Sequence, residues 1–179
     1  MLISDVRDYS SIAEVVDPST LASMLNDHRG AMSEVVAGSG GTVMDFSGDS
    51  VMAVFGAPIP LEGHPDSAFE AAKQMQIRQE SLNESWTQNG LSPFHIGIGL
   101  STGTVAAAIL GSEEKMEYSV VGDSVNLAQR LQQWAKRGHI ILSEPTYKAI
   151  RNPPQMEDLG MREVKGKSLE VRAYRYCVT

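Results

Sequence analysis

The sequence lacks several features that would place it in common classes of protein. Its 179 residues include one cysteine, Cys177, so no internal disulfide can form, and this composition fits a reducing compartment. No apolar run approaches the ~20 residues that span a bilayer, and no secretory signal peptide is visible at the start. We therefore expect a cytoplasmic protein, or the cytoplasmic domain of a larger one, with no membrane contact by this segment.

Zinc sites and nucleic-acid binding are also disfavoured. The four histidines are scattered along the chain, and none has zinc-ligand spacing to Cys177 or to another histidine. The net charge of −7 disfavours a nucleic-acid or anionic-membrane partner. It leaves an anionic substrate open, because bound metal ions can reverse the local field.

The spacing of apolar residues predicts alternating helices and strands. One helix is expected to begin at Pro18 with Asp17 as its N-cap. A longer one is expected from Asp66, and Gln76 and Gln79 interrupt its apolar stripe. The other expected elements are strands at 42–46, 51–55, 94–100, 118–121 and 139–142, helices from 123 and over 145–150, and a closing hairpin of 161–165 with 169–177.

This order predicts an α/β or α+β domain with helices packed on a sheet, and the length fits one domain over residues 1–179. Gly97 and Gly99 share one face of the strand at 94–100, where small side chains allow close approach of another backbone. The strand before Asp5 is very short for a buried strand. We expect that the domain is cut from a longer chain, or that its first strand is unusually short.

Two acidic residues follow apolar strand patterns. Asp49 lies in the turn Ser47-Gly48-Asp49, and Asp5 follows Leu2-Ile3-Ser4. A carboxylate at the end of a buried strand is costly unless a positive charge meets it. Two such acids at two strand ends predict a site for hard divalent cations.

Several stretches together resemble the catalytic domains of class III nucleotidyl cyclases. They occur in the order typical of that family, and the resemblance covers nearly the whole chain. The stretches are Ile3-Ser4-Asp5-Val6, Gly40-Gly41-Thr42-Val43, Phe46–Phe55, Glu117–Arg130 and Val164-Lys165-Gly166-Lys167.

The resemblance implies a ferredoxin-like α+β core with a mainly antiparallel sheet. It also implies a head-to-tail homodimer with active sites at the interface and two Mg²⁺ or Mn²⁺ ions per site. Asp5, Asp49 and the backbone carbonyl of Val6 would hold the metals. The reaction implied is in-line attack of the ribose 3′-hydroxyl on the α-phosphorus of a nucleoside triphosphate, which releases pyrophosphate and a cyclic nucleotide for signal transduction.

The same resemblance gives roles to residues of the opposite protomer. Asn126 would orient the ribose, Arg130 would stabilise the pentavalent phosphorus, and Lys165 would hold the terminal phosphates. Asn126 and Arg130 are four residues apart on one expected helix, so they should share a face.

The identity of the base depends on Asp45 and Ser119. Adenylate cyclases of this family usually carry lysine at the first position and aspartate or threonine at the second. An acid with a small residue is closer to the guanine pattern, since a carboxylate can accept from guanine N1–H and N2–H₂. Prokaryotic members are mostly adenylate cyclases, so we expect ATP, with GTP as the alternative.

A third interpretation is a catalytically silent dimerisation or nucleotide-sensing domain. It is suggested by Asp45 and by Asp8, which stands where the family often has glycine beside the phosphates. Catalytic domains of this family are usually fused to a regulatory domain, so we expect a regulatory domain outside this segment.

Overall fold

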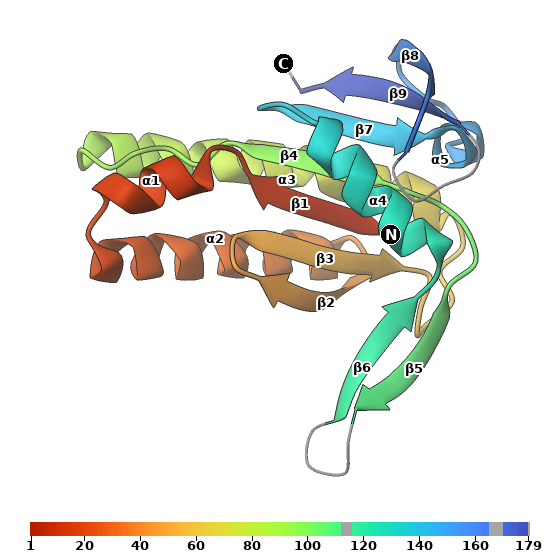
Figure 1. Cartoon of the computed structure of the whole chain (residues 1–179), viewed down its shortest axis with the longest axis horizontal. Helices are drawn as coiled ribbons and strands as arrows, with labels where there is room; N and C mark the ends of the chain where they lie inside the picture. The colour runs from red at the N-terminus through yellow and green to blue at the C-terminus, as the bar shows by residue number, and fades with distance from the viewer. Residues whose placement is uncertain (112–115, 165–169, 179) are drawn as a thin grey trace.

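One mixed sheet forms the centre of the molecule (Figure 1). In the computed structural model, which describes residues 1–111, 116–164 and 170–178, this sheet has seven strands in the order β2-β3-β1-β4-β7-β9-β8. Neighbouring strands are antiparallel except the parallel pair β4 and β7. The strands are β1 (Leu2–Val6), β2 (Gly41–Ser47), β3 (Ser50–Phe55), β4 (Ile96–Leu100), β7 (His139–Ser143), β8 (Glu157–Arg162) and β9 (Val171–Cys177). The predicted α+β fold with a mainly antiparallel sheet is confirmed.

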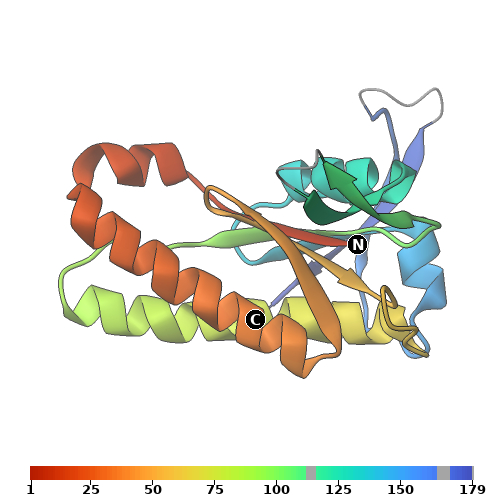
Figure 2. The same cartoon turned by 90° about the horizontal axis from the view of Figure 1, so that it is seen from below.

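Helices cover both faces of this sheet (Figures 1 and 2). The long helices α2 (Pro18–Gly38) and α3 (His64–Gln88) pack together on one face, and α4 (Asp123–Trp134) lies across β1, β4 and β7 on the other. Two helices are shorter: α1 (Tyr9–Val15) follows β1, and α5 (Glu144–Ala149) contacts β7 and β9. Within the described residues, no helix is both long enough and apolar enough to cross a membrane.

A separate hairpin of β5 (Ala106–Gly111) and β6 (Met116–Val121) projects from the body of the domain (Figure 1). Its large apolar side chains Ile109 and Val121 are 67% and 48% exposed. Because Val121 pairs with Ala106 and side chains alternate along a strand, Ile109 and Val121 lie on opposite faces of the hairpin.

Polar side chains of the two long helices, α2 and α3, explain where α2 begins and why α3 has glutamines on its buried face. The Asp17 carboxylate accepts a hydrogen bond from the Thr20 N–H at 3.0 Å, which caps α2 before Pro18 as predicted. The glutamines that interrupt the stripe of α3 are buried, and Gln76 Nε2 donates to the Ile96 carbonyl at 3.0 Å. Gln76 thus satisfies a backbone group where the chain enters β4, while Gln79 bonds the side chains of His28 and Asn83.

Several predicted boundaries were wrong. The predicted strand at 161–165 is β8, which spans Glu157–Arg162; its pairing with β9 shifts between Asp158 and Met161, around a left-handed Gly160. That irregularity hides the alternation of a strand. The strand predicted from residue 94 begins at Ile96, and α1 and β5 were not predicted.

Candidate active site

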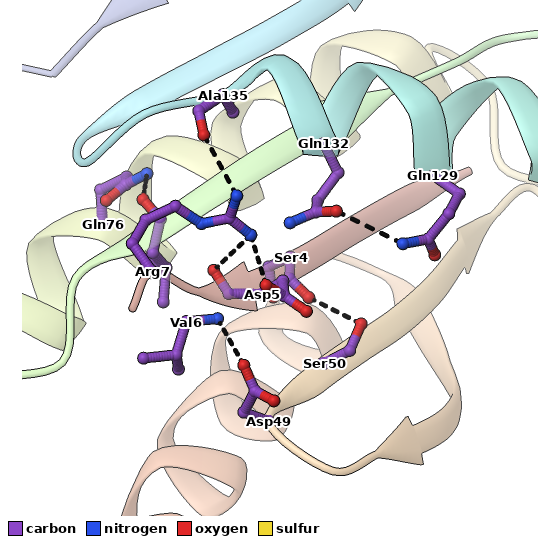
Figure 3. A network of polar contacts seen from close by, with 11 residues as sticks. Ser4, Asp5, Val6, Arg7, Asp49, Ser50, Gln76, Gln129, Gln132 and Ala135 are labelled. Atoms are coloured by element: carbon purple, nitrogen blue, oxygen red, sulfur yellow. Dashed lines mark hydrogen bonds and ion pairs between the residues drawn. The ribbon is translucent and has the colours of Figure 1, made fainter. Parts of the chain in front are cut away.

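The two predicted metal acids lie close together at one end of the sheet (Figure 3). Because β1 pairs with β3, the turn between β2 and β3 reaches the end of β1. Asp49 Oδ2 accepts a hydrogen bond from the Val6 N–H at 3.1 Å. Asp5 lies within β1, paired with Gly97, and not after the strand as predicted. The structure therefore brings Asp5, Val6 and Asp49 to one place.

The electrostatics of this place favour a cation. Burial raises the pKa of Asp5, and the negative charge of Asp49 raises it further. A divalent cation between the two carboxylates would relieve this repulsion. No cluster of three or more His, Cys, Asp or Glu side chains suited to a metal is found in the described part of the chain. The donor set is thus two carboxylates, which suits Mg²⁺ that completes its shell with water and phosphate oxygens.

An arginine that the sequence reasoning missed is bound to one of these acids. Arg7 Nη2 forms an ion pair with Asp5 Oδ1, and Arg7 Nη1 donates to the Ala135 carbonyl at 3.4 Å (Figure 3). Its positive charge lowers the pKa of Asp5, against the two larger effects. Strand alternation was an available signal, because residues two apart point to the same side.

A glutamine from α4 also faces Asp5. Gln132 is 1% exposed, and its Oε1 accepts from Gln129 Nε2 at 3.3 Å. Its Nε2 is buried without a hydrogen-bond partner, yet the amide lies near enough to lower the pKa of Asp5. Figure 3 shows the side chain between α4 and the end of β1.

The helix that carries Gln132 rests directly on the backbone of the sheet. A Cβ atom at Gly99 would lie 2.2 Å from the Ala128 carbonyl oxygen, and one at Gly97 would lie 2.7 Å from that of Ala135. The close approach predicted from Gly97 and Gly99 is therefore present, and α4 is what approaches.

The predicted transition-state residues lie on another side of α4. Asn126 is exposed and Arg130 is half-buried, whereas Leu127 and Leu131 face the core. Arg130 Nη1 donates to Gln133 Oε1 at 3.2 Å. Within the described residues, no hydrogen bond or ion pair joins Asn126 or Arg130 to Asp5 or Asp49.

The predicted base-reading residues lie on neighbouring strands. Asp45 is exposed on β2, just after an irregularity in its pairing with β3, and Ser119 is half-buried on β6. The strands β2 and β6 contact each other. Lys165 lies outside the described residues.

Asp8 occupies an unusual backbone conformation at the start of α1. Its φ of 59° is in the left-handed region, where glycine is favoured, and its carboxylate pairs with Arg137 Nη2 at 3.2 Å. This position therefore has a backbone conformation that suits glycine, although the residue in this chain is aspartate.

Comparison with known proteins identifies the family of the chain. The family described as "Adenylate and Guanylate cyclase catalytic domain" matches residues 1–177. Adenylate cyclase 1 of Rhizobium meliloti is 30% identical over 97% of this chain, which spans 26% of that protein. The solved adenylyl cyclase CyaB from P. aeruginosa superposes with a TM-score of 0.93 at 30% identity, covering 97% of this chain and 90% of that one. The guanylyl cyclase Cya2 gives 0.90 at 32%, covering 97% and 88%.

The chain therefore belongs to the adenylate and guanylate cyclase catalytic domain family, the class III cyclases, which are lyases that form cyclic nucleotides. Of the two solved relatives, one is named for adenylate and the other for guanylate chemistry at similar identity, so the family alone leaves the base open.

Proposed function

We propose that this domain converts ATP to 3′,5′-cyclic AMP and pyrophosphate. The observation that carries the proposal is the meeting of Asp5 and Asp49 beside Val6, with a pKa of Asp5 raised by burial and by its acidic neighbour. In this proposal Asp5, Asp49 and the Val6 carbonyl hold two Mg²⁺ or Mn²⁺ ions. When bound, such metals lower the pKa of the ribose 3′-hydroxyl and offset the charge on the phosphates.

The remaining groups come from a second copy of the chain. Within the described residues, Asn126 and Arg130 make no hydrogen bond or ion pair with the acids of their own chain, which supports a site completed by the partner. A planar guanidinium such as that of Arg130 suits the equatorial oxygens of the α-phosphorus, and Asn126 would orient the ribose. Lys165 would hold the terminal phosphates. The projecting hairpin with exposed Ile109 and Val121 supports a homodimer.

A mixing experiment tests this arrangement. Asp49→Asn and Arg130→Ala should each abolish Mn²⁺-dependent turnover, because each destroys both sites of a homodimer. Mixing the two variants with random exchange gives half heterodimers, each with one intact site, so about a quarter of the parent activity should return. No recovery after verified exchange would contradict the two-chain site. Asp27→Asn, on the exposed side of α2, is the matched control and should remain active.

GTP is the second candidate substrate, and Asp45 with Ser119 favours it. An ionised Asp45 matches the N1–H and N2–H₂ donors of guanine, and an unmatched buried polar edge costs about 1–3 kcal/mol. Asp45→Lys should therefore shift the ratio of kcat/KM towards ATP by about 10- to 100-fold. An unchanged ratio would show that Asp45 does not contact the base.

The silent dimerisation or sensing domain makes a different prediction. It requires that the parent yield no cyclic product from any of the four nucleoside triphosphates with Mn²⁺, while nucleotide binding persists. Robust turnover with any of them removes it.

We also propose a larger context for the domain. Because it spans 26% of its Rhizobium relative, we expect residues 1–179 to form one catalytic unit fused to a regulatory segment. In this proposal the reaction takes place in the cytoplasm.

A further inference from the structure

We propose that Arg7 is a resident counter-ion that occupies Asp5 in the metal-free protein and competes with the divalent cation for it. This rests on the proposed function, in which Asp5 and Asp49 bind the metal. Arg7 is thereby a positioning residue of the metal site.

The contacts of Arg7 hold its guanidinium over the metal acid. Besides the ion pair with Asp5 Oδ1, its Nη2 lies 3.4 Å from the backbone oxygen of Asp5. Its Nη1 donates to the carbonyl of Ala135, the C-cap residue of α4. The C-terminal end of a helix carries partial negative charge, which favours a cation there. Arg7 is thus held by β1 and by α4 at once.

Enclosure makes this pair stronger than an ordinary surface pair. The Arg7 and Asp5 side chains are only 19% and 30% exposed, and Arg7 Nε is buried without a partner. Screening by solvent and salt is reduced for partly buried charges. A second acid, Asp49, stands beside the pair, so the metal-free site needs a positive charge to offset two neighbouring carboxylates.

The same charge opposes the metal. A guanidinium remains protonated at any working pH, so Arg7 stays positive when a divalent cation approaches Asp5. The cation must share the carboxylate and meet a like charge a few ångströms away. Coulomb repulsion over such a distance, even with a dielectric close to that of water, corresponds to an affinity loss of about tenfold.

Gln132 provides a second donor beside the same acid. Its buried Nε2 has no partner and faces Asp5. If Arg7 yielded its share of the carboxylate to a metal, this neutral amide is placed to donate to Asp5 without repelling the cation. The site therefore has a charged donor bound to Asp5 and a neutral donor beside it.

The test measures Mn²⁺ binding without nucleotide, from the loss of the free-ion signal in electron paramagnetic resonance, together with thermal unfolding in EDTA. Arg7→Gln should bind Mn²⁺ about tenfold more tightly than the parent and unfold at a lower temperature in EDTA. Added Mn²⁺ should then raise its unfolding temperature more than it raises that of the parent. Arg137→Gln, which removes the exposed pair with Asp8, is the control and should match the parent in Mn²⁺ affinity.

The outcomes separate this inference from the proposed function. If Asp49→Asn binds Mn²⁺ as the parent does, the metal site and the role of Arg7 are both wrong. If Asp49→Asn loses Mn²⁺ but Arg7→Gln binds no more tightly than the parent, only the role of Arg7 is overturned. Should Arg7→Gln fail to fold, Arg7→Met decides: it keeps the length of the side chain without the charge, so a gain in Mn²⁺ affinity is again expected, and no gain overturns the inference.

Discussion

The contact between α4 and the sheet makes Gly99 a sharp test of how the site is built. A Cβ atom at this position would lie 2.2 Å from the Ala128 carbonyl oxygen and 2.4 Å from the Gln132 backbone nitrogen. Ordinary contacts begin at 3.4 Å, so Gly99→Ala requires α4 to retreat by about 1 Å, since backbone atoms cannot swing aside. Overpacking of this kind costs about 1–3 kcal/mol of unfolding free energy.

The retreat should damage activity more than stability. The proposed catalytic residues Asn126 and Arg130 belong to α4 and would move with it. A displacement of about 1 Å in positioning groups can cost about 100-fold in rate. Gly99→Ala should therefore lose about two orders of magnitude in Mn²⁺-dependent kcat while remaining folded.

Urea unfolding and cyclase turnover, measured on the same preparations, check both expectations. Gly30→Ala is the matched control, because its Cβ would meet nothing within 4 Å on α2, and it should raise stability by about 0.5–1 kcal/mol. A Gly99→Ala protein with the stability and kcat of the parent would refute the claim that α4 is held by backbone contact.

Three further changes address the core and the start of α1. Burial lowers the pKa of His28, whose Nδ1 donates to Gln79 Oε1 at 2.6 Å. Below about pH 6.5 the unfolded chain therefore binds a proton that the folded chain does not. As the pH is lowered, the free energy of unfolding should decrease by at most about 1.4 kcal/mol per pH unit. In His28→Gln this decline, followed by urea unfolding between pH 7.5 and 5.5, should be shallower, and an equal slope would refute the assignment. Asn83→Ala should cost about 2–4 kcal/mol in urea unfolding, because Asn83 satisfies both the N–H and the carbonyl of Phe94 at 2.9 and 2.7 Å; a loss below 1 kcal/mol would contradict this. Asp8→Gly should lower the KM for Mn²⁺-ATP, since it removes a negative charge and a left-handed non-glycine residue, and a raised KM would show that Asp8 assists binding.

Local sequence signals predicted the elements whose causes are local. The cap at Asp17, the turn that holds Asp49 and the paired glycines of β4 each follow from a few neighbouring residues. In contrast, α1 has no fully buried residue and no side-chain cap, and only the partly buried Tyr9 and Ile12 of its seven residues pack against the core, which is a weak local signal. The strand β5 is rich in alanine and is ordered by pairing with β6, which no local pattern reveals.

The site divides in the same way. The proximity of Asp5 and Asp49 could be predicted because each stands next to a strongly apolar strand. The contact from Arg7 to Ala135 joins positions 128 residues apart, so it required the tertiary structure. The burial of Gln132 Nε2 beside Asp5 depends on the same approach of α4 to β1. In the sequence, Gln132 is only a polar residue on an expected helix.

The placement of α4 has a consequence for how two active sites work together. In the proposed dimer, one side of α4 supplies Asn126 and Arg130 to the partner's site. In its own site, Gln132 of the same helix lies beside Asp5, and the carbonyl of Ala135 at the end of the helix accepts from Arg7. A single rigid helix then belongs to both catalytic centres. Because Arg7 contacts both Asp5 and the end of α4, a change in its contact with Asp5 would also bias the position of that helix, and with it Asn126 and Arg130 in the other centre. The two sites should therefore fill and turn over as a coupled pair, with a Hill coefficient for the metal that differs from one.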